Sequence, residues 1–307
     1  MNKSIVVVGS SNTDMIVKAA RIPRPVETIL GGRFSVAAGG KGANQAVAAA
    51  RAGGEVTLIA RVGEDMFGEQ ALIGFAQDDI NIRHIIRDRE MPSGVALIMV
   101  DEKGENSIAV ASGCNACLSP QDVDKAEKTI SSARILLMQL EVPLDTVRTA
   151  AEIASMHGVE VLLNPAPAQP LDDDLLKKIS LLTPNETEAE MLTGIKVENE
   201  QSAAEAAEAL RSRGVKMVFI TLGARGVYAA ASEFRGIIPA FKVKAEDTTA
   251  AGDVFNGVLS VSLAEGKCLL DAVRFASAAA ALSVTRMGAQ TSAPYRKEIE
   301  DFLKIQG

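Results

Sequence analysis

Residues 246–257 read Glu-Asp-Thr-Thr-Ala-Ala-Gly-Asp-Val-Phe-Asn-Gly, and they predict a helix that begins just before Asp253. The first turn of a helix leaves backbone N–H groups unpaired and carries partial positive charge. Because the three residues before Asp253 have small side chains or none, these N–H groups can approach a phosphate closely. A carboxylate in that turn would repel a phosphate unless a second substrate needs a base, so the pattern indicates phosphoryl transfer to an alcohol. The stretch also fits Asp247 and Asp253 as helix caps beside a face of small residues.

Short apolar runs alternate with amphipathic helical patterns along the rest of the chain. Strands are predicted at Ile5–Val8, Val56–Ile59, Ile135–Met138, Val159–Leu163 and Met217–Thr221, and helices at Thr146–Met156 and Gln201–Ser212. This alternation is typical of a parallel sheet covered by helices on both faces. We therefore expect a doubly wound α/β fold with a central, mostly parallel sheet.

Two stretches interrupt the alternation, Met15–Ala37 and Ser93–Ala111, which have turn residues and β-branched runs but no long helical period. Within the second, two apolar runs flank Asp101-Glu-Lys-Gly-Glu-Asn106, which is a hairpin signal. Small sheets at one edge of an α/β domain often act as lids. We expect one domain over residues 1–307, with a small β-sheet lid from about residues 13–37 and 93–111.

Composition excludes several classes of protein. The 307 residues are 47% hydrophobic, which is enough for a sizeable core and too many for a disordered chain. The net charge of −7 argues against electrostatic binding to nucleic acid. No apolar run approaches the length that spans a membrane, and the run Ile5–Val8 is too short for a signal-peptide core. These features predict a cytoplasmic protein with no membrane partner.

A second glycine-rich segment reads Gly-Gly-Lys-Gly-Ala-Asn-Gln-Ala-Val over residues 39–47 and runs into an alanine-rich helix pattern. Its glycines at 39, 40 and 42 permit close approach of the backbone to a ligand. They also fit a tight turn before a helix. The segment is not a Walker A loop, because Gly42 follows Lys41 where that motif needs Ser or Thr.

The two glycine-containing segments resemble the N-terminal and C-terminal signatures of the phosphofructokinase-B type carbohydrate kinases, in the ribokinase branch. Other motifs fall in the family's order over nearly the whole chain. They are Gly9-Ser-Ser-Asn12-Thr-Asp14, Gln139-Leu-Glu141, Asn164-Pro-Ala-Pro-Ala, Thr183-Pro-Asn185-Glu-Thr-Glu188, Thr221-Leu-Gly223-Ala-Arg225-Gly226 and Thr285-Arg-Met-Gly288-Ala.

This resemblance implies a ribokinase-like fold and ATP-dependent phosphorylation of D-ribose at the 5-hydroxyl. It leaves open a related kinase for deoxyribose, another sugar or a nucleoside. A catalytically silent sugar- or nucleotide-binding protein on the same fold is a further alternative, although Asp253 and the glycine-rich segments argue against it. The family also implies a magnesium requirement, activation by potassium, and a homodimer formed through the lid sheet.

The predicted site residues follow from the chain's own chemistry and from the family positions they match. Asp253 is the predicted general base, which accepts the proton of the sugar hydroxyl as that oxygen attacks the γ-phosphate. The backbone N–H groups of Ala250, Ala251 and Gly252 are expected to stabilise charge on the transferring phosphoryl group.

The remaining assignments come from the resemblance. The sugar is implied to bind Asn12, Asp14, Gly40, Lys41, Asn44, Glu141 and Asp253. The nucleotide and its magnesium are implied to bind Asn185, Glu188, Thr221, Gly223, Arg225, Gly226, Gly252 and Ser277. The potassium ring is implied at Asp247, Thr249, Ser283, Arg286, Gly288 and Ser292, several of them through backbone oxygens. Asn185 and Glu188 also fit a helix-capping pair, and the two roles can coexist.

Three positions depart from the family pattern. Val26 in Pro25-Val26-Glu27-Thr28 replaces the usual glycine, which is expected to alter the lid turn. Val254 follows the base where Thr or Ala is common. Ser277 stands where many members carry His or Asn near adenine.

Overall fold

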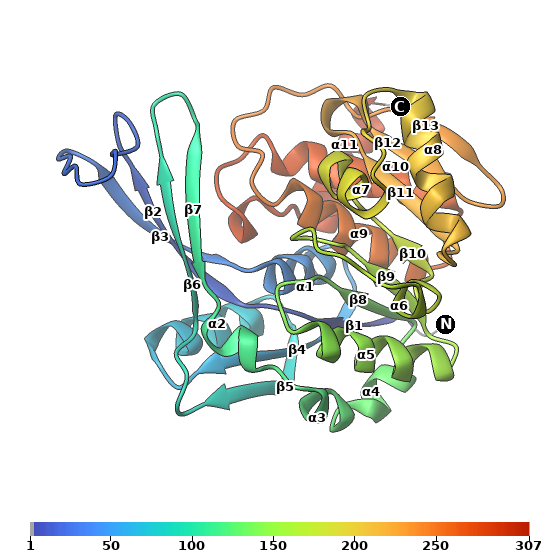
Figure 1. Ribbon diagram of the computed structural model, residues 1–307, viewed down its shortest axis with the longest axis horizontal. Coiled ribbons are helices and arrows are strands. Elements are labelled where there is room, and N and C mark those ends of the chain that lie inside the picture. The colour runs from blue at the N-terminus through green and yellow to red at the C-terminus, as the bar shows by residue number, and fades with distance from the viewer. Residues whose placement is uncertain (1–2, 307) are drawn as a thin grey trace.

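The computed structural model describes residues 3–306, and two sheets organise it (Figure 1). The larger sheet has nine strands in the order β13-β12-β11-β10-β9-β8-β1-β4-β5. All its neighbouring strands are parallel except β11–β12 and β12–β13. Its strands are β1 (Ser4–Val8), β4 (Glu55–Gly63), β5 (Asn81–Asp88), β8 (Ile135–Met138), β9 (Glu160–Leu163), β10 (Leu181–Leu182), β11 (Met217–Thr221), β12 (Val227–Ala230) and β13 (Arg235–Ile238). The predicted α/β fold with a mostly parallel central sheet is confirmed.

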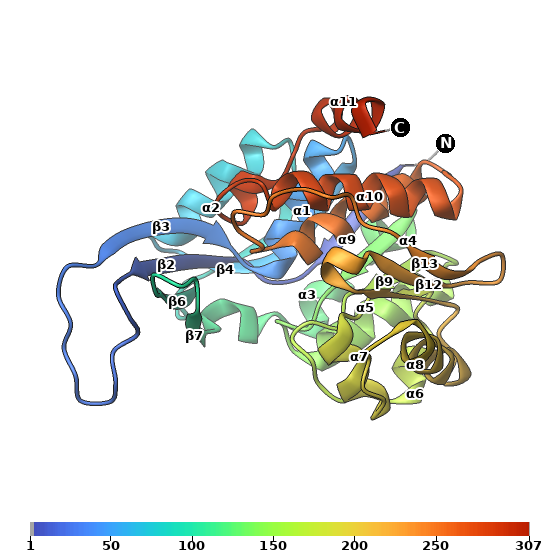
Figure 2. The ribbon, with the colours of Figure 1, turned by 90° about the horizontal axis from the view of Figure 1, so that it is seen from above.

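Helices cover both faces of this sheet, as the view in Figure 2 shows. One layer contains α1 (Lys41–Arg51), α2 (Met66–Gln77), α9 (Ala251–Ala264), α10 (Leu269–Ser283) and α11 (Arg296–Gln306). The other contains α3 (Pro120–Asp124), α4 (Glu127–Ser131), α5 (Leu144–Met156), α6 (Asp173–Leu176), α7 (Glu186–Thr193) and α8 (Glu200–Ser212). Short 3₁₀ turns η1 (Gly113–Cys117), η2 (Gly223–Arg225) and η3 (Gln290–Ser292) complete the elements.

Strand β1 shows why the apolar runs are continuous rather than alternating. Ile5 and Val7 pack into the core shared with α1, α9 and α10, whereas Val6 and Val8 pack into the core shared with α5 and α8. A strand buried on both faces needs an apolar side chain at every position. Among the residues that the structure describes, no helix is both long and apolar enough to cross a bilayer.

The smaller sheet has four strands in the order β3-β2-β6-β7 and stands beside the central sheet (Figure 1). They are β2 (Asn12–Lys18), β3 (Arg33–Gly39), β6 (Gly94–Val100) and β7 (Asn106–Ala111). The predicted hairpin is β6–β7, and β2 pairs with β6 in parallel register. We call this sheet the small sheet.

Between β2 and β3, Val26 adopts φ 67° and is fully exposed. A β-branched residue in this left-handed region is strained, which explains why glycine is usual in the family pattern at this position. The turn is held by Glu27, whose carboxylate pairs with Arg21 and accepts a hydrogen bond from the Arg24 N–H.

Candidate active site

The predicted site residues gather at the carboxyl ends of the central strands. Ser10 and Ser11 follow β1, Gln139 and Glu141 follow β8, and Asn164 follows β9. Open α/β sheets bind their ligands at this edge, because the strand ends place loops and helix N-termini together there. Helix α9 brings Asp253 to the same edge, where its carboxylate meets side chains of α1.

Asp253 lies in the first turn of α9, as predicted, and is buried. Its Oδ2 accepts a hydrogen bond from Asn44 Nδ2 at 3.0 Å, and its Oδ1 accepts one from Gln45 Nε2 at 2.9 Å. Burial raises the pKa of the Asp253 carboxyl, and the charge of Lys41 and the two amides oppose that rise. The helix-cap alternative does not account for these contacts, because the carboxylate bonds to α1 and caps no backbone N–H group of its own helix.

The turn before Asp253 has unused backbone donors. Ala250 has φ 58°, in the left-handed region, and Ala251 follows as the first helical residue. When a residue in the left-handed conformation precedes one in the right-handed conformation, their successive N–H groups point into one concavity. Such a concavity, called a nest, can bind an anion. Ala251 N–H already donates to Thr248 O at 3.3 Å, whereas in the described chain those of Ala250 and Gly252 have no partner. A Cβ on Gly252 would meet nothing within 4 Å, so there is free space beside this turn.

A buried hydrogen-bond chain holds this turn in place. Asn256 Nδ2 donates to Gly252 O at 2.8 Å, and Asn256 Oδ1 accepts from Thr183 Oγ1 at 2.6 Å. Thr183 follows β10, so the turn is tied directly to the central sheet. The motif analysis placed Thr183 in the family's order without assigning it this role.

A hollow of about 380 Å³ lies in front of the site, between the small sheet and the loops after β8 and β9. Asn12 and Glu141 line it together with Val110 of β7. Glu141 Oε2 accepts hydrogen bonds from Ser10 Oγ at 2.5 Å and from Lys41 N at 2.9 Å. The two predicted sugar residues therefore face one cavity, although they are far apart in sequence.

Asn12 is oriented by a residue that the motif analysis missed. Asn115, in the 3₁₀ turn η1, donates from Nδ2 to Asn12 Oδ1 at 2.7 Å, while its Oδ1 accepts from Ser11 N at 2.9 Å. The carbonyl end of Asn12 is thus engaged, and its Nδ2 remains for a ligand. An amide so fixed recognises a hydrogen-bond acceptor, such as a hydroxyl oxygen.

The glycines at the start of α1 serve the packing of the chain against itself. Gly40 has φ 88°, and a Cβ there would lie 2.7 Å from Asn12 N. A Cβ on Gly39 would lie within about 2.4 Å of the Asp14 carboxylate. Small residues are therefore required where β3 passes into α1, because this junction lies directly against β2.

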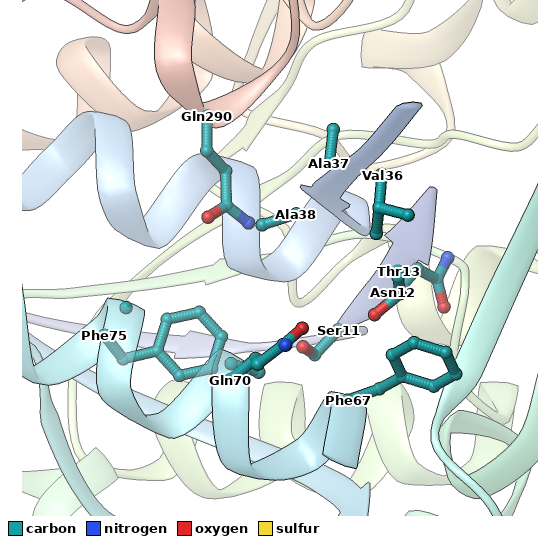
Figure 3. A pocket seen from close by; sticks show the side chains of 12 residues that line it. Ser11, Asn12, Thr13, Val36, Ala37, Ala38, Phe67, Gln70, Phe75 and Gln290 are labelled. Atoms are coloured by element: carbon teal, nitrogen blue, oxygen red, sulfur yellow. The ribbon is translucent and has the colours of Figure 1, made fainter. Parts of the chain in front are cut away.

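A second hollow, of about 130 Å³, lies beside the N-terminal end of β2 (Figure 3). Phe67 and Gln70 of α2 line one side of it, and Val36 of β3 lies opposite. Asn12 borders both hollows. The base of the small sheet is therefore loosely packed against the central domain.

Like charges converge on the site. Burial, together with the charges of Glu141 and Asp253, raises the pKa of Asp14 to about 6. Burial also raises the pKa of Glu188, which lies near enough to feel both Lys41 and Asp253. The pKa of Lys41 is raised, mainly by Asp253, so Lys41 supplies the compensating positive charge. Perturbed groups clustered in a cleft are typical of functional sites.

Most of the predicted nucleotide residues lie at or after the ends of β10 and β11, whereas Gly252 lies in α9 and Ser277 in α10. Asn185 and Glu188 form a complete capping box at the start of α7, with reciprocal bonds of 2.8 Å. Arg225 donates to Glu198 O and pairs with Glu186, so its guanidinium braces the loop after β11. Gly223 and Gly226 both have positive φ in that loop, and Thr221 N donates to Pro184 O. Ser277 is buried in α10, with its hydroxyl unpartnered in the described chain.

The predicted cation residues surround the loop before Asp253. Asp247 Oδ1 accepts from Thr249 N at 2.9 Å and Oδ2 accepts from Gly288 N at 2.8 Å. Burial raises the pKa of Asp247, but these hydrogen bonds outweigh it and hold the pKa below its usual value, so the carboxylate is charged. The hydroxyls of Ser283 and Ser292 donate to backbone carbonyls of their own turns. Arg286 pairs with Glu298 through its guanidinium, which has no oxygen, so Arg286 can contribute an oxygen only from its backbone carbonyl.

Comparison with known proteins matches these features to a family. The model of the pfkB family carbohydrate kinases matches residues 2–296. The chain belongs to the pfkB family of carbohydrate kinases. The site described above therefore lies in a pfkB carbohydrate kinase.

Individual pfkB relatives align over the full length. A ribokinase of Haemophilus influenzae is 48% identical, with 99% of each chain covered. A deoxyribokinase of Salmonella typhimurium is 36% identical and covers 98% of this chain and 99% of its own. The structure of an Arabidopsis thaliana ribokinase complexed with ribose and ATP superposes with a TM-score of 0.90 at 33% identity, over 99% of each chain.

Proposed function

We propose that this pfkB kinase transfers the γ-phosphoryl group of ATP to the 5-hydroxyl of D-ribose. The observation that carries the proposal is a buried carboxylate, Asp253, held by two amides directly beside a nest with two unused N–H donors. Ribose is favoured because the ribokinase of Haemophilus influenzae is 48% identical over the whole chain. Deoxyribose is the second candidate, because a deoxyribokinase is also similar over its whole length.

Asp253 acts as the general base in this proposal. Its carboxylate accepts the proton of the sugar hydroxyl while that oxygen attacks phosphorus and the bond to the bridging oxygen of ADP breaks. The N–H groups of Ala250 and Gly252 stabilise the negative charge on the transferring group, and the open space at Gly252 fits a phosphate. The base contributes about 10²–10⁴-fold to the rate.

Sugar recognition is assigned to the hollow of about 380 Å³ that Asn12 and Glu141 line. Asn12 donates a hydrogen bond from its Nδ2 to a hydroxyl oxygen of the sugar. Asp14, when it is ionised, accepts a hydrogen bond from a sugar hydroxyl. The hydrogen bond from Asn44 to Asp253 supports a position for the reacting 5-hydroxyl beside Asp253. Lys41, which is positively charged beside Asp253, fits an interaction with the phosphate as well as with the sugar.

Magnesium fits the acidic group at Glu188, where Asn185 and Glu188 can contact the ion through water while they cap α7. When bound with ATP, it neutralises phosphate charge. Potassium is assigned to the Asp247 loop, where the carboxylate is charged and the backbone N–H groups of Thr249 and Gly288 hold it in place. Turnover should be higher in potassium than in sodium at equal ionic strength. Equal rates after removal of contaminating potassium would contradict a functional potassium site.

We also propose that the small sheet is a lid and the surface of a homodimer. Asp14, Ala96 and Val110 are cross-strand neighbours, so the face that borders the sugar hollow continues outward to Ile16, Ile98 and Ile108. Ile108 is 54% exposed although it is a β-branched apolar residue. A second copy of the chain packed on this face would cover both its apolar residues and the sugar.

One assay tests the proposed function. ADP release is measured with purified protein, ATP and magnesium, across a panel of pentoses, 2-deoxyribose, hexoses and nucleosides, with a blank that lacks any acceptor. Ribose should give the highest kcat/KM, and the product should carry phosphate on carbon 5. ADP release that is the same with and without every acceptor would overturn the proposal and favour a binding protein.

A further inference from the structure

A buried row of side-chain amides lies behind Asp253. It consists of Gln139 after β8, Gln45 on α1 and Asn164 after β9, all of them buried. Gln139 Nε2 donates to Gln45 Oε1 at 2.5 Å. Gln45 Nε2 then donates both to Asn164 Oδ1 at 3.1 Å and to Asp253 Oδ1 at 2.9 Å. The row therefore ends on the carboxylate that the proposed function uses as its base.

The direction of every bond in this row is fixed by one backbone group. Asn164 Nδ2 donates to Thr183 O at 3.1 Å, and a backbone carbonyl can only accept. Asn164 must therefore turn its Oδ1 toward Gln45, which in turn must present its Nε2. Gln45 consequently faces Asp253 as a donor, and its Oε1 is left to accept from Gln139.

We propose that Gln45 is a positioning residue for Asp253, and that Gln139 and Asn164 act through it by fixing the orientation of its amide. This assignment rests on the proposed role of Asp253 as the base. With Gln45 on Oδ1 and Asn44 on Oδ2, the carboxylate is clamped at both oxygens. The carboxylate is thereby held in one orientation, and each of its oxygens keeps acceptor capacity for the sugar hydroxyl.

The same amide acts on the charge of the base. Four charged groups influence Asp253 from the surrounding elements, namely Lys41 on α1, Glu141 after β8, Asp14 on β2 and Glu188 on α7. Three of the four are acidic, and burial further disfavours the ionised form of Asp253. A hydrogen bond donated to a carboxylate favours its charged form. Gln45 therefore helps to keep the base ionised as well as aligned.

A purely structural role predicts a different outcome. Gln45 also ties α1 to the strands through Gln139 and Asn164, so its loss could loosen the fold without any specific effect on the base. Residues that act as one unit show non-additive losses, whereas independent structural damage lowers the rate by the same factor in any background. A double-mutant cycle between Gln45 and Asp253 separates the two roles.

The experiment uses Gln45→Met, Asp253→Asn and the double variant in the full-length protein, with the acceptor that gives the highest turnover in the panel. Gln45→Met should lower kcat by about 10- to 100-fold, the effect of losing a hydrogen bond to a charged group. It should move the acidic limb of the kcat profile to higher pH and leave the dissociation constant of ATP unchanged. In the Asp253→Asn background it should cause no further loss.

Ser262→Ala is the matched control, because Ser262 is a buried polar residue of the same helix as Asp253 and has no partner in the described chain. It should leave kcat and its pH profile unchanged. If Gln45→Met does not fold, Gln139→Met is tested in its place. Gln139 is connected to Asp253 only by way of its hydrogen bond to Gln45. Gln139→Met should cause a smaller loss of kcat that is likewise absent in the Asp253→Asn background.

Two results would overturn the inference while leaving the proposed function intact. One is an equal fold-loss of kcat from Gln45→Met in both backgrounds, and the other is an unshifted acidic limb. Wild-type protein that turns over no acceptor would instead overturn the proposed function, and the inference with it.

Discussion

The two ends of the site, the surroundings of Asp253 and the small sheet, differ in how many contacts hold their side chains in place. At the base end, both oxygens of the Asp253 carboxylate already accept hydrogen bonds, and the turn before it is tied to the sheet through Asn256 and Thr183. At the other end, the small sheet, which we propose as the lid, carries exposed apolar side chains such as Ile108, and a hollow lies beside Asn12 at its base. The proposed base is therefore fixed within the central domain, whereas the proposed sugar lid is a sheet with exposed apolar side chains.

This difference has a physical reason. A catalytic carboxylate must be held within a fraction of an ångström, which rigid, buried elements achieve. A lid must open to admit substrate, so it is made from few packed contacts.

The largest effect is expected at the base end. Asp253→Asn should lower kcat by about 10²–10⁴-fold, because Asn cannot accept the hydroxyl proton. Binding of ATP, measured by calorimetry, should persist because the N–H groups of Ala250 and Gly252 are unchanged. Near-normal turnover by the purified variant would show that another group is the base.

The next effect concerns the face of the small sheet that we propose as the dimer surface. Ile108→Glu should weaken the proposed dimer by on the order of 100-fold, because a charge cannot be buried unpaired in an apolar contact. Leu97→Glu is the matched control, since Leu97 is 55% exposed on the opposite face of the same sheet. Sedimentation of both variants over a concentration series measures the shift. A dimer weakened by Leu97→Glu but not by Ile108→Glu would place the contact on the other face.

Sugar discrimination should change by a smaller factor. Asn12→Met removes the Nδ2 donor that Asn115 holds toward the hollow, and leaving a polar partner unmatched costs about 1–3 kcal/mol. The ratio of kcat/KM for ribose over 2-deoxyribose should therefore fall by about tenfold. If Asn12 only shapes the turn after β1, both sugars should be affected alike and the ratio should stay constant.

The smallest effect concerns stability. Asp14 has a pKa of about 6 in the folded protein against an ordinary value of 3.8, so the folded state binds the proton more tightly than the unfolded state. Stability is thus lost as pH rises from about 4 to about 6, and that cost persists above pH 6. Asp14→Asn should raise Tm at pH 8 by about 2 °C, while sugar affinity falls. The gain should vanish at pH 4.

Asp124→Asn is the control for this measurement, because Asp124 is exposed and distant in sequence from the site. It should change Tm at neither pH. A Tm for Asp14→Asn that is lower than that of the wild type at pH 8 would mean that the carboxylate stabilises the fold, contrary to its raised pKa.

Much of the fold could be predicted from the chain alone, because a strand buried on both faces leaves an unbroken apolar run. The run at Ile135–Met138 matches β8 in full, whereas β4 extends from Glu55 to Gly63, beyond the predicted Val56–Ile59, because its far end pairs with β5. The start of α9 at Ala251 was also predictable, since small residues and one acid mark it.

The contacts that finish the site could not be predicted in this way. Asn115 lies 103 residues from Asn12 along the chain, and the Gln45–Asp253 bond spans 208 residues, so no local pattern signals either. The glycine-rich segment predicts a close approach to a ligand or a tight turn before a helix, but not that Gly39 and Gly40 lie against β2, because that contact exists only once the small sheet has formed. The sequence does not show which amide side chains are buried, because Gln and Asn also occur on the protein surface.

Amide hydrogen exchange with and without ribose tests the contrast between the two ends most directly. Protein carrying bound ADP is compared before and after addition of saturating ribose, and protection is followed in α1 and α9 against β2, β6 and β7. The account predicts that α1 and α9 are protected from the start and change little, whereas the strands of the small sheet gain protection when ribose binds. Strands already fully protected without ribose, or a gain confined to α1 and α9, would contradict it.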